Sequence, residues 1–311
     1  MPAGISWERF IGGLRRFLAR LRKGLQRRYS AAMDWLVPER PKVALRNAVD
    51  NSPIAAGYPF DPEAKLLRSI GVEGPMFDIG ANAGDYSALF EDLVGPGNLF
   101  IVEPLPLLYH KLKRKFRQSR VFKLALSDRE ATENMRIPFL AGYPYDTRAT
   151  LNQHLEPGQT GTQTVSANLS TLDSLVASLG LAKVGFLKID VEGHELAVLK
   201  GARNVLRYFK PLILIEAEAR HHSFSLSVIF EFIEGFGYAG YYLDPSRLEL
   251  REVKDFDCSR DQSLSRLQER DLFHYLNNFL FVDLAVKRAF VENASRFLEA
   301  EKVQTDFGKS E

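Results

Sequence analysis

The segment that most constrains the fold is residues 75–84, with the sequence PMFDIGANAG. A short apolar run ends in two glycines, and apolar residues spaced by three and four follow it. This order predicts a buried strand, a tight glycine turn and a helix whose first turn has free backbone N–H groups. A second apolar strand, 98–104, places Glu103 about 20 residues after the turn, where nucleotide-binding α/β units hold a ribose diol.

The residues of the turn favour S-adenosyl-L-methionine (SAM) over a dinucleotide. Asn82 stands where a GxGxxG motif has its second glycine, and a larger side chain hinders close approach of a pyrophosphate. Asp78 at the strand end would repel a phosphate but attract a cation. SAM has an adenosine, a sulfonium and an ammonium, and no phosphate. NAD and a purely structural turn remain as alternatives.

The rest of the chain predicts an α/β fold with a mostly parallel sheet and helices on both faces. The later strands are expected at 120–126, 184–190, 211–219, 238–243 and 279–282. Helices are expected at 64–70, 104–118, 196–206, 226–236 and 284–300. Residues 131–170 interrupt this alternation with two short strands, 135–140 and 162–168, around a polar loop. We interpret 131–170 as a substrate lid, with a disordered loop as the alternative.

Residues 1–60 are predicted to form a basic amphipathic helix and a linker. The first 40 residues contain nine Lys or Arg and three Asp or Glu, a net charge of +6, so the remainder carries −4. One helical face contains the apolar side chains of Trp7, Phe10, Ile11, Leu14, Phe17, Leu18, Leu21 and Leu25. This face suits peripheral contact with an anionic membrane, or docking on the protein's own body or a second subunit through residues 7–28.

Composition limits the remaining classes. The net charge of +2 and the lack of aromatic residues among the basic positions of the first segment give no indication of nucleic acid. Cys258 is the only cysteine, and no apolar run reaches the roughly 20 residues that span a bilayer. We expect a cytoplasmic protein, with contact at the inner membrane surface as the alternative. The predicted divisions are 1–60, a catalytic domain at 61–285, and a C-terminal helix and tail at 286–311.

Several motifs together resemble the FkbM-type SAM-dependent methyltransferases. They are FDIGANAGDYS at 77–87, IVEP at 101–104, STLDSL at 170–175, LKIDVEGHELAVLKGA at 187–202, ILIEAE at 213–218 and NNFLFV at 277–282. The resemblance covers roughly residues 70–285. It implies a Rossmann-like class I methyltransferase fold with a seven-stranded sheet. It also implies methyl transfer to a hydroxyl of a sugar, glycan, glycolipid or secondary metabolite.

The motif positions give a predicted cofactor site. Its residues are Asp78, Gly80, Asn82, Gly84, Glu103 and Asp128. The two glycines would shape the turn, and Asp78 would lie beside the methionine ammonium. Glu103 would accept hydrogen bonds from the ribose hydroxyls, and Asp128 would meet the adenine amino group.

Acidic and histidine side chains after the fourth and fifth strands give the predicted catalytic set of Asp190, Glu192, His194 and Glu216. Both strand ends should face the ligand crevice. His194 is the predicted base and Asp190 its orienting partner, because imidazole titrates near neutrality. Capping of the following helix is the alternative role for His194 and Glu192. Asp190, Glu192 and Glu216 could instead bind Mg²⁺, and we leave that metal unassigned.

Two other functions remain at this stage. The first is a non-catalytic scaffold that docks a partner or membrane through its N-terminal helix. The second is an NAD-dependent oxidoreductase, which the turn spacing and the absence of a Tyr-x-x-x-Lys motif disfavour.

Overall fold

The computed structural model describes residues 62–140, 142–263 and 275–307. The predicted N-terminal helix and linker lie outside the described residues. The predicted contacts of residues 7–28 and the division at residue 60 therefore stay predictions.

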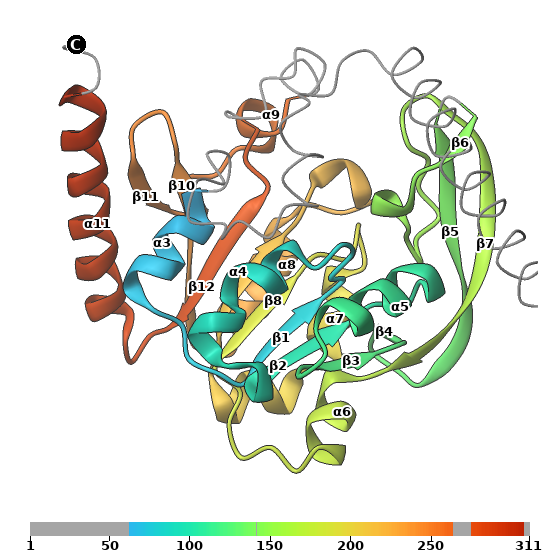
Figure 1. Ribbon diagram of the computed structural model, residues 1–311. Coiled ribbons are helices and arrows are strands. Elements are labelled where there is room, and N and C mark those ends of the chain that lie inside the picture. The colour runs from blue at the N-terminus through green and yellow to red at the C-terminus, as the bar shows by residue number, and fades with distance from the viewer. Residues whose placement is uncertain (1–61, 141, 264–274, 308–311) are drawn as a thin grey trace, which may run out of the picture. The chain divides into compact units, whose positions relative to one another are not determined.

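The main sheet has eight strands in the order β11-β10-β12-β9-β8-β1-β2-β3 (Figure 1). Their bounds are β1 Met76–Ile79, β2 Leu99–Val102, β3 Arg120–Phe122, β8 Phe186–Ile189, β9 Leu212–Glu216, β10 Tyr238–Asp244, β11 Glu249–Glu252 and β12 Asn278–Asp283. The strands from β9 to β3 are parallel, whereas β12 runs antiparallel to both of its neighbours. The doubly wound α/β prediction is confirmed, but the number of strands is corrected from seven to eight. The added edge strand, β11, forms an antiparallel hairpin with β10.

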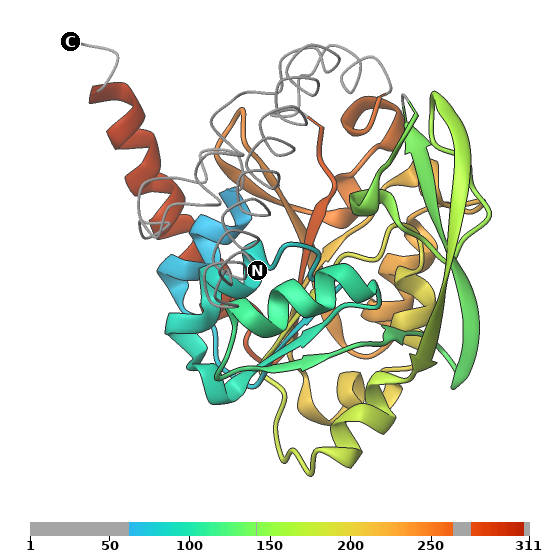
Figure 2. The same ribbon diagram turned by 45° about the vertical axis from the view of Figure 1, so that its right-hand side comes forward.

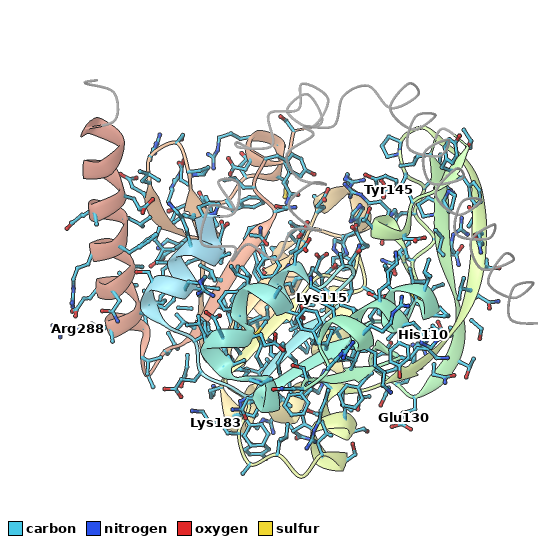
Figure 3. All side chains as sticks on the ribbon, viewed as in Figure 1. His110, Lys115, Glu130, Tyr145, Lys183 and Arg288 are labelled. Atoms are coloured by element: carbon cyan, nitrogen blue, oxygen red, sulfur yellow. The ribbon has the colours of Figure 1, made fainter. Side chains whose placement is uncertain are left out.

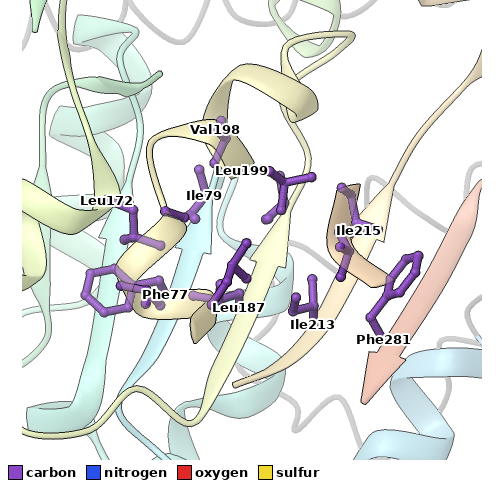
Figure 4. Packing of buried hydrophobic residues seen from close by; sticks show 14 of the residues in the cluster. Phe77, Ile79, Leu172, Leu187, Val198, Leu199, Ile213, Ile215 and Phe281 are labelled. Carbon is purple, nitrogen blue, oxygen red and sulfur yellow. The ribbon is translucent and has the colours of Figure 1, made fainter. Parts of the chain in front are cut away.

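Helices cover both faces of this sheet because successive strand residues point to opposite sides. One face packs against α3 Pro62–Ile70, α4 Asp85–Val94, α5 Pro106–Lys115 and α11 Lys287–Phe307. The other packs against α6 Leu172–Ser178, α7 Glu195–Lys200 and α8 Ser227–Glu234. Figure 4 shows this second core, where Phe77 and Leu187 of the sheet lie among the side chains of the covering helices.

Short elements join these layers. They are the 3₁₀ turns η2 Pro96–Asn98, η3 Asp146–Arg148, η5 Ala219–His221 and η6 Val253–Asp255, the π-helical turn η4 Val205–Phe209, and the short helix α9 Cys258–Asp261. The predicted helix 196–206 is therefore divided into α7 and η4. Among the described residues, no helix has both the length and the apolar content needed to cross a bilayer.

The interruption at 131–170 is a second sheet of four strands, in the order β4-β7-β5-β6. Its strands are β4 Ala125–Leu126, β5 Ala131–Leu140, β6 Tyr143–Pro144 and β7 Gln159–Ser170. The long β5 and β7 lie side by side as an antiparallel hairpin (Figure 2). The predicted strand 120–126 was wrong as one element, because β3 belongs to the main sheet and β4 pairs with the end of β7.

A small separate core anchors this second sheet on α5. Met135, Ile137, Ala167 and Leu169 pack with Leu108 and its neighbours. The chain then enters α6 with Thr171 as the cap, whose side chain accepts the Ser174 N–H at 3.0 Å. The hairpin therefore connects to the main fold at both of its ends.

Candidate active site

A pocket opens at the carboxyl ends of β1, β2 and β8. This edge lies where the chain changes direction across the sheet, which is where open α/β sheets bind ligands. The structure brings together six predicted site residues along the pocket wall: Gly80, Asn82, Glu103, Asp190, Glu192 and His194. Among the described residues, those that line the pocket do not include the other four predicted site residues, which are Asp78, Gly84, Asp128 and Glu216.

Gly80 holds the turn after β1 tightly against the end of β8. Its φ is +80°, and an added Cβ would lie 1.8 Å from the backbone oxygen of Asp190. Its N–H donates to the carbonyl of Val102 at 3.0 Å. A glycine is therefore required at position 80, because the ends of β1, β2 and β8 meet there to form the pocket floor.

Gly84 has a different local role. An added Cβ there would lie 2.5 Å from Leu112 and 2.6 Å from Phe116, two side chains of the α5 region. Close packing of the start of α4 therefore explains this glycine without a ligand.

Glu103 directs a buried carboxylate into the pocket from the end of β2. Its two oxygens accept backbone N–H groups from Asn82 at 2.9 Å and Leu105 at 2.8 Å. Burial raises the pKa of Glu103 to about 7. A carboxylate oxygen has two lone pairs, so each oxygen retains acceptor capacity for a hydroxyl group. This donor and acceptor pattern fits a ribose diol.

Beside Glu103, the pocket wall is apolar. It includes Leu105, Leu124, Leu126 and Met135. Such a wall fits the flat face of a purine. With Glu103, it suits the adenosine portion of SAM.

Asp78 lies beneath the turn, within the sheet. It is 2% exposed and accepts a hydrogen bond from Ser87 Oγ at 2.5 Å. Burial raises its pKa to about 6, although the bond from Ser87 opposes this shift. Asp128 is instead on the surface, where its carboxylate pairs with Arg129 at 2.8 Å.

Lys188 is a buried cation that the sequence reasoning missed. It is 1% exposed on β8, and its Nζ lies 3.7 Å from Asp190 and 3.6 Å from Glu216. The same ammonium lies 4.7 Å from the centre of the Tyr86 ring. A lysine inside the apolar run VGFLKID was the available signal. The Lys188 ammonium therefore compensates negative charge on two of the four predicted catalytic residues, Asp190 and Glu216.

Glu216 is held beside Lys188 at the end of β9. Asn277 Nδ2 donates to its Oε1 at 2.6 Å. Burial raises the pKa of Glu216 to about 8. Glu216 and Asp190, on neighbouring strands, therefore share the Lys188 ammonium.

His194 lies at the N-terminus of α7, with Nε2 3.0 Å from Ser127 Oγ. Its side chain makes no capping hydrogen bond to the helix. Among the contacts of the described residues, its ring nitrogen is paired with Ser127 and not with the expected Asp190. Burial lowers the pKa of His194, so the imidazole is neutral at pH 7 and able to accept a proton.

The loop before His194 is held in a strained conformation by the inserted segment. Glu192 has φ +52°, which is unfavourable for a residue with a Cβ. Its carbonyl accepts Thr150 Oγ1 at 2.7 Å, and the carbonyl of Gly193 accepts the Asn152 amide. The insertion therefore fixes the position of two predicted catalytic residues, Glu192 and His194.

Charged side chains around Glu192 form an arginine–carboxylate cluster, which consists of Arg148, Glu156, Glu192, Glu218 and Arg220. Arg148 Nη1 lies 3.5 Å from Glu192 and 3.3 Å from Glu218. Arg220 Nη1 lies 2.6 Å from Glu156. Burial raises the pKa of Glu192, and Arg148 opposes this shift. The two arginines were missed because they come from irregular segments with no periodic signal.

The comparisons with known proteins agree with the sequence motifs. The family model described as the methyltransferase FkbM domain matches residues 78–239, about half of the chain. The hexuronic acid methyltransferase AglP of Haloferax volcanii is 27% identical over 154 residues, which cover 50% of this chain and 60% of that protein. The chain thus matches less than two thirds of the length of this relative.

Similar solved structures include a methyltransferase FkbM from Methylobacillus flagellatus. It is 17% identical with a TM-score of 0.41, and the match covers 67% of this chain and 43% of that one. Fibrillarin from Aeropyrum pernix, solved with bound SAM, is 14% identical with a TM-score of 0.37. That match covers 71% of this chain and 74% of the other.

Proposed function

Because the chain belongs to the FkbM methyltransferase family, we propose that it transfers a methyl group from SAM to a hydroxyl oxygen of a sugar or glycan. One observation carries this proposal. A single pocket joins Gly80, Asn82 and Glu103, which suit adenosine, to His194, whose neutral imidazole can accept a proton. Cofactor and acceptor would therefore meet at one point, as group transfer requires.

SAM, when bound, supplies a methyl group on a positively charged sulfur. The residues of the chain must then orient the acceptor oxygen, exclude water and remove its proton. We propose that His194 Nε2 takes the proton of the acceptor hydroxyl. The protonated nitrogen can then donate a hydrogen bond to Ser127 Oγ. Contacts of Asp78, Gly84 and Asp128 with the cofactor stay predictions.

The proposed class of acceptor rests on one comparison. The similarity to a hexuronic acid methyltransferase supports an acidic sugar. Membership of a methyltransferase family does not favour the scaffold alternative.

Calorimetric titration with SAM and S-adenosylhomocysteine tests the cofactor half. We expect saturable binding to the wild type and at least about tenfold weaker binding to Glu103→Gln, because a hydrogen bond to a charged acceptor is lost. Glu130→Gln is the matched control, because Glu130 is an exposed carboxylate outside the pocket (Figure 3). Failure of the wild type to bind either ligand would overturn the proposal.

Transfer of a labelled methyl group tests the acceptor half. Uronic-acid oligosaccharides and their neutral counterparts serve as acceptors. We expect His194→Gln to lower kcat by about 10²-fold or more, the usual contribution of a positioned base, while SAM affinity stays within about threefold. Equal kcat in wild type and variant would remove His194 from the proton-transfer step.

A further inference from the structure

Three side chains behind the Glu192–His194 loop converge on one point. His154 Nε2 and His221 Nε2 each lie 3.2 Å from the same oxygen, Glu156 Oε1. The donor atoms of all three residues lie within 4.8 Å of one another. The two imidazole rings stack, with centroids 4.6 Å apart. We propose that His154, Glu156 and His221 bind a divalent first-row transition metal.

Hydrogen bonding alone does not account for this arrangement. His221 is 4% exposed, and its Nε2 makes no hydrogen bond of acceptable geometry with any described residue, although Glu156 is close. A buried nitrogen without a directed partner costs free energy. Each nitrogen lies 3.2 Å from the shared oxygen, a separation that suits two ligand atoms on one ion with bonds near 2.1 Å. A metal would therefore give the His221 lone pair its partner.

The surrounding groups resemble the outer shell of a metal site. His221 Nδ1 lies 3.3 Å from Glu192, and a carboxylate on the far nitrogen is the usual way to orient a ligating imidazole. Arg220 holds the other oxygen of Glu156 at 2.6 Å.

A protonated His221 is the rival explanation, and the experiment below separates it from a bound metal.

The donor set also selects the metal. Imidazole nitrogens favour Zn²⁺, Fe²⁺ or Co²⁺, whereas Mg²⁺ favours oxygen ligands. The oxygen set considered for Mg²⁺ is less suitable, because the Lys188 ammonium lies within 3.7 Å of both Asp190 and Glu216.

Three protein ligands leave coordination positions open. His154 and His221 line a second cavity, and His194 lines both this cavity and the pocket beside Glu103. A small oxygen-bearing ligand in the second cavity could complete the coordination. The metal proposal stands independently of methyl transfer.

Metal content and Co²⁺ titration test the site on the full chain, without an affinity tag that binds metal. After chelation and dialysis, we expect one equivalent of Co²⁺ to bind with a change in visible absorption, and Zn²⁺ to displace it. Glu156→Gln and His154→Asn should lose this binding, and Glu192→Gln should weaken it about 10–100-fold. SAM titration and circular dichroism of each variant show whether it is folded.

Two control variants leave His154, Glu156 and His221 in place. His222→Gln removes another imidazole of the same cavity, and His110→Gln removes an exposed one on α5 (Figure 3). Both should bind Co²⁺ as the wild type does. The proposal is overturned if the folded wild type binds no Co²⁺ or Zn²⁺ at micromolar concentration, the result expected for a protonated His221. It is also overturned if His222→Gln or His110→Gln abolishes the signal.

Discussion

The two walls of the pocket are built in contrasting ways. The cofactor side combines strand ends and apolar side chains with one buried carboxylate, Glu103. The opposite side carries Asp190, Glu192 and His194, and near it charged pairs join segments far apart in sequence, such as Arg148 with Glu218 and Glu156 with Arg220. The comparison teaches that backbone geometry shapes the first wall, whereas electrostatic compensation shapes the second.

The strongest test of this contrast removes the buried cation Lys188, which pairs with Asp190 of the charged wall. Lys188→Met should lower the free energy of unfolding by about 3–5 kcal/mol, because Asp190 and Glu216 lose their compensating charge. Urea unfolding measures this change. Lys183→Met is the control, since its pair with Glu73 is exposed and should contribute less than about 1 kcal/mol. Equal effects in the two variants would contradict the distinction.

The second test disturbs backbone geometry on the cofactor wall. Gly80→Ala should cost about 3 kcal/mol, because its φ is +80° and its Cβ would meet the carbonyl of Asp190. Gly97→Ala has open space and should change stability by less than about 0.5 kcal/mol. Thermal unfolding of both variants measures the difference. A stable Gly80→Ala would show that the turn tolerates displacement.

The third test uses pH. Glu103 has its pKa raised from 4.5 to about 7 in the folded protein, so the folded state holds a proton that the unfolded state releases between these values. Its contribution to stability is therefore greatest below pH 4.5 and falls as pH rises to about 7. From pH 5 to 8, the loss of stability should be about 2 kcal/mol smaller in Glu103→Gln than in the wild type. Parallel pH profiles would show that Glu103 does not titrate in this range.

The smallest effect on stability is expected for the exposed ion pairs of Arg129, which lie away from both walls. Arg129 contacts Asp128 and Glu133 at the surface, with its side chain 56% exposed. Arg129→Ala should change the free energy of unfolding by less than about 0.5 kcal/mol at moderate salt. Chemical unfolding in low and high salt measures this, and a loss above 2 kcal/mol would show that surface charge matters more than burial.

The sequence predicted the position of Gly80, Asn82 and Glu103 around one pocket well because its signals there are local. The glycines of the turn, the apolar strands and Glu103 follow spacings set by one strand-turn-helix unit. The main sheet was likewise predictable, apart from β11, whose sequence ELRE has no apolar alternation. These features depend on neighbours in the chain.

The charged wall was only partly predictable because its contacts are tertiary. Glu192 and His194 were found from their position after a strand, but the pairing of His194 with Ser127 joins residues 67 positions apart. His154 and Glu156 lie in a segment without regular structure, and no period relates them to His221. The β5–β7 hairpin was underestimated because its outer residues are polar and exposed.

That hairpin also has an evolutionary consequence. It leaves the main fold after β4 and returns beside it, since Leu126 pairs with Ser170. Insertions or deletions toward its tip can therefore lengthen or shorten one boundary of the pocket while Gly80 and Glu103 keep their places. Substrate range can diverge among descendants of such a chain by remodelling one appendage, with the half proposed to bind the nucleoside inherited unchanged.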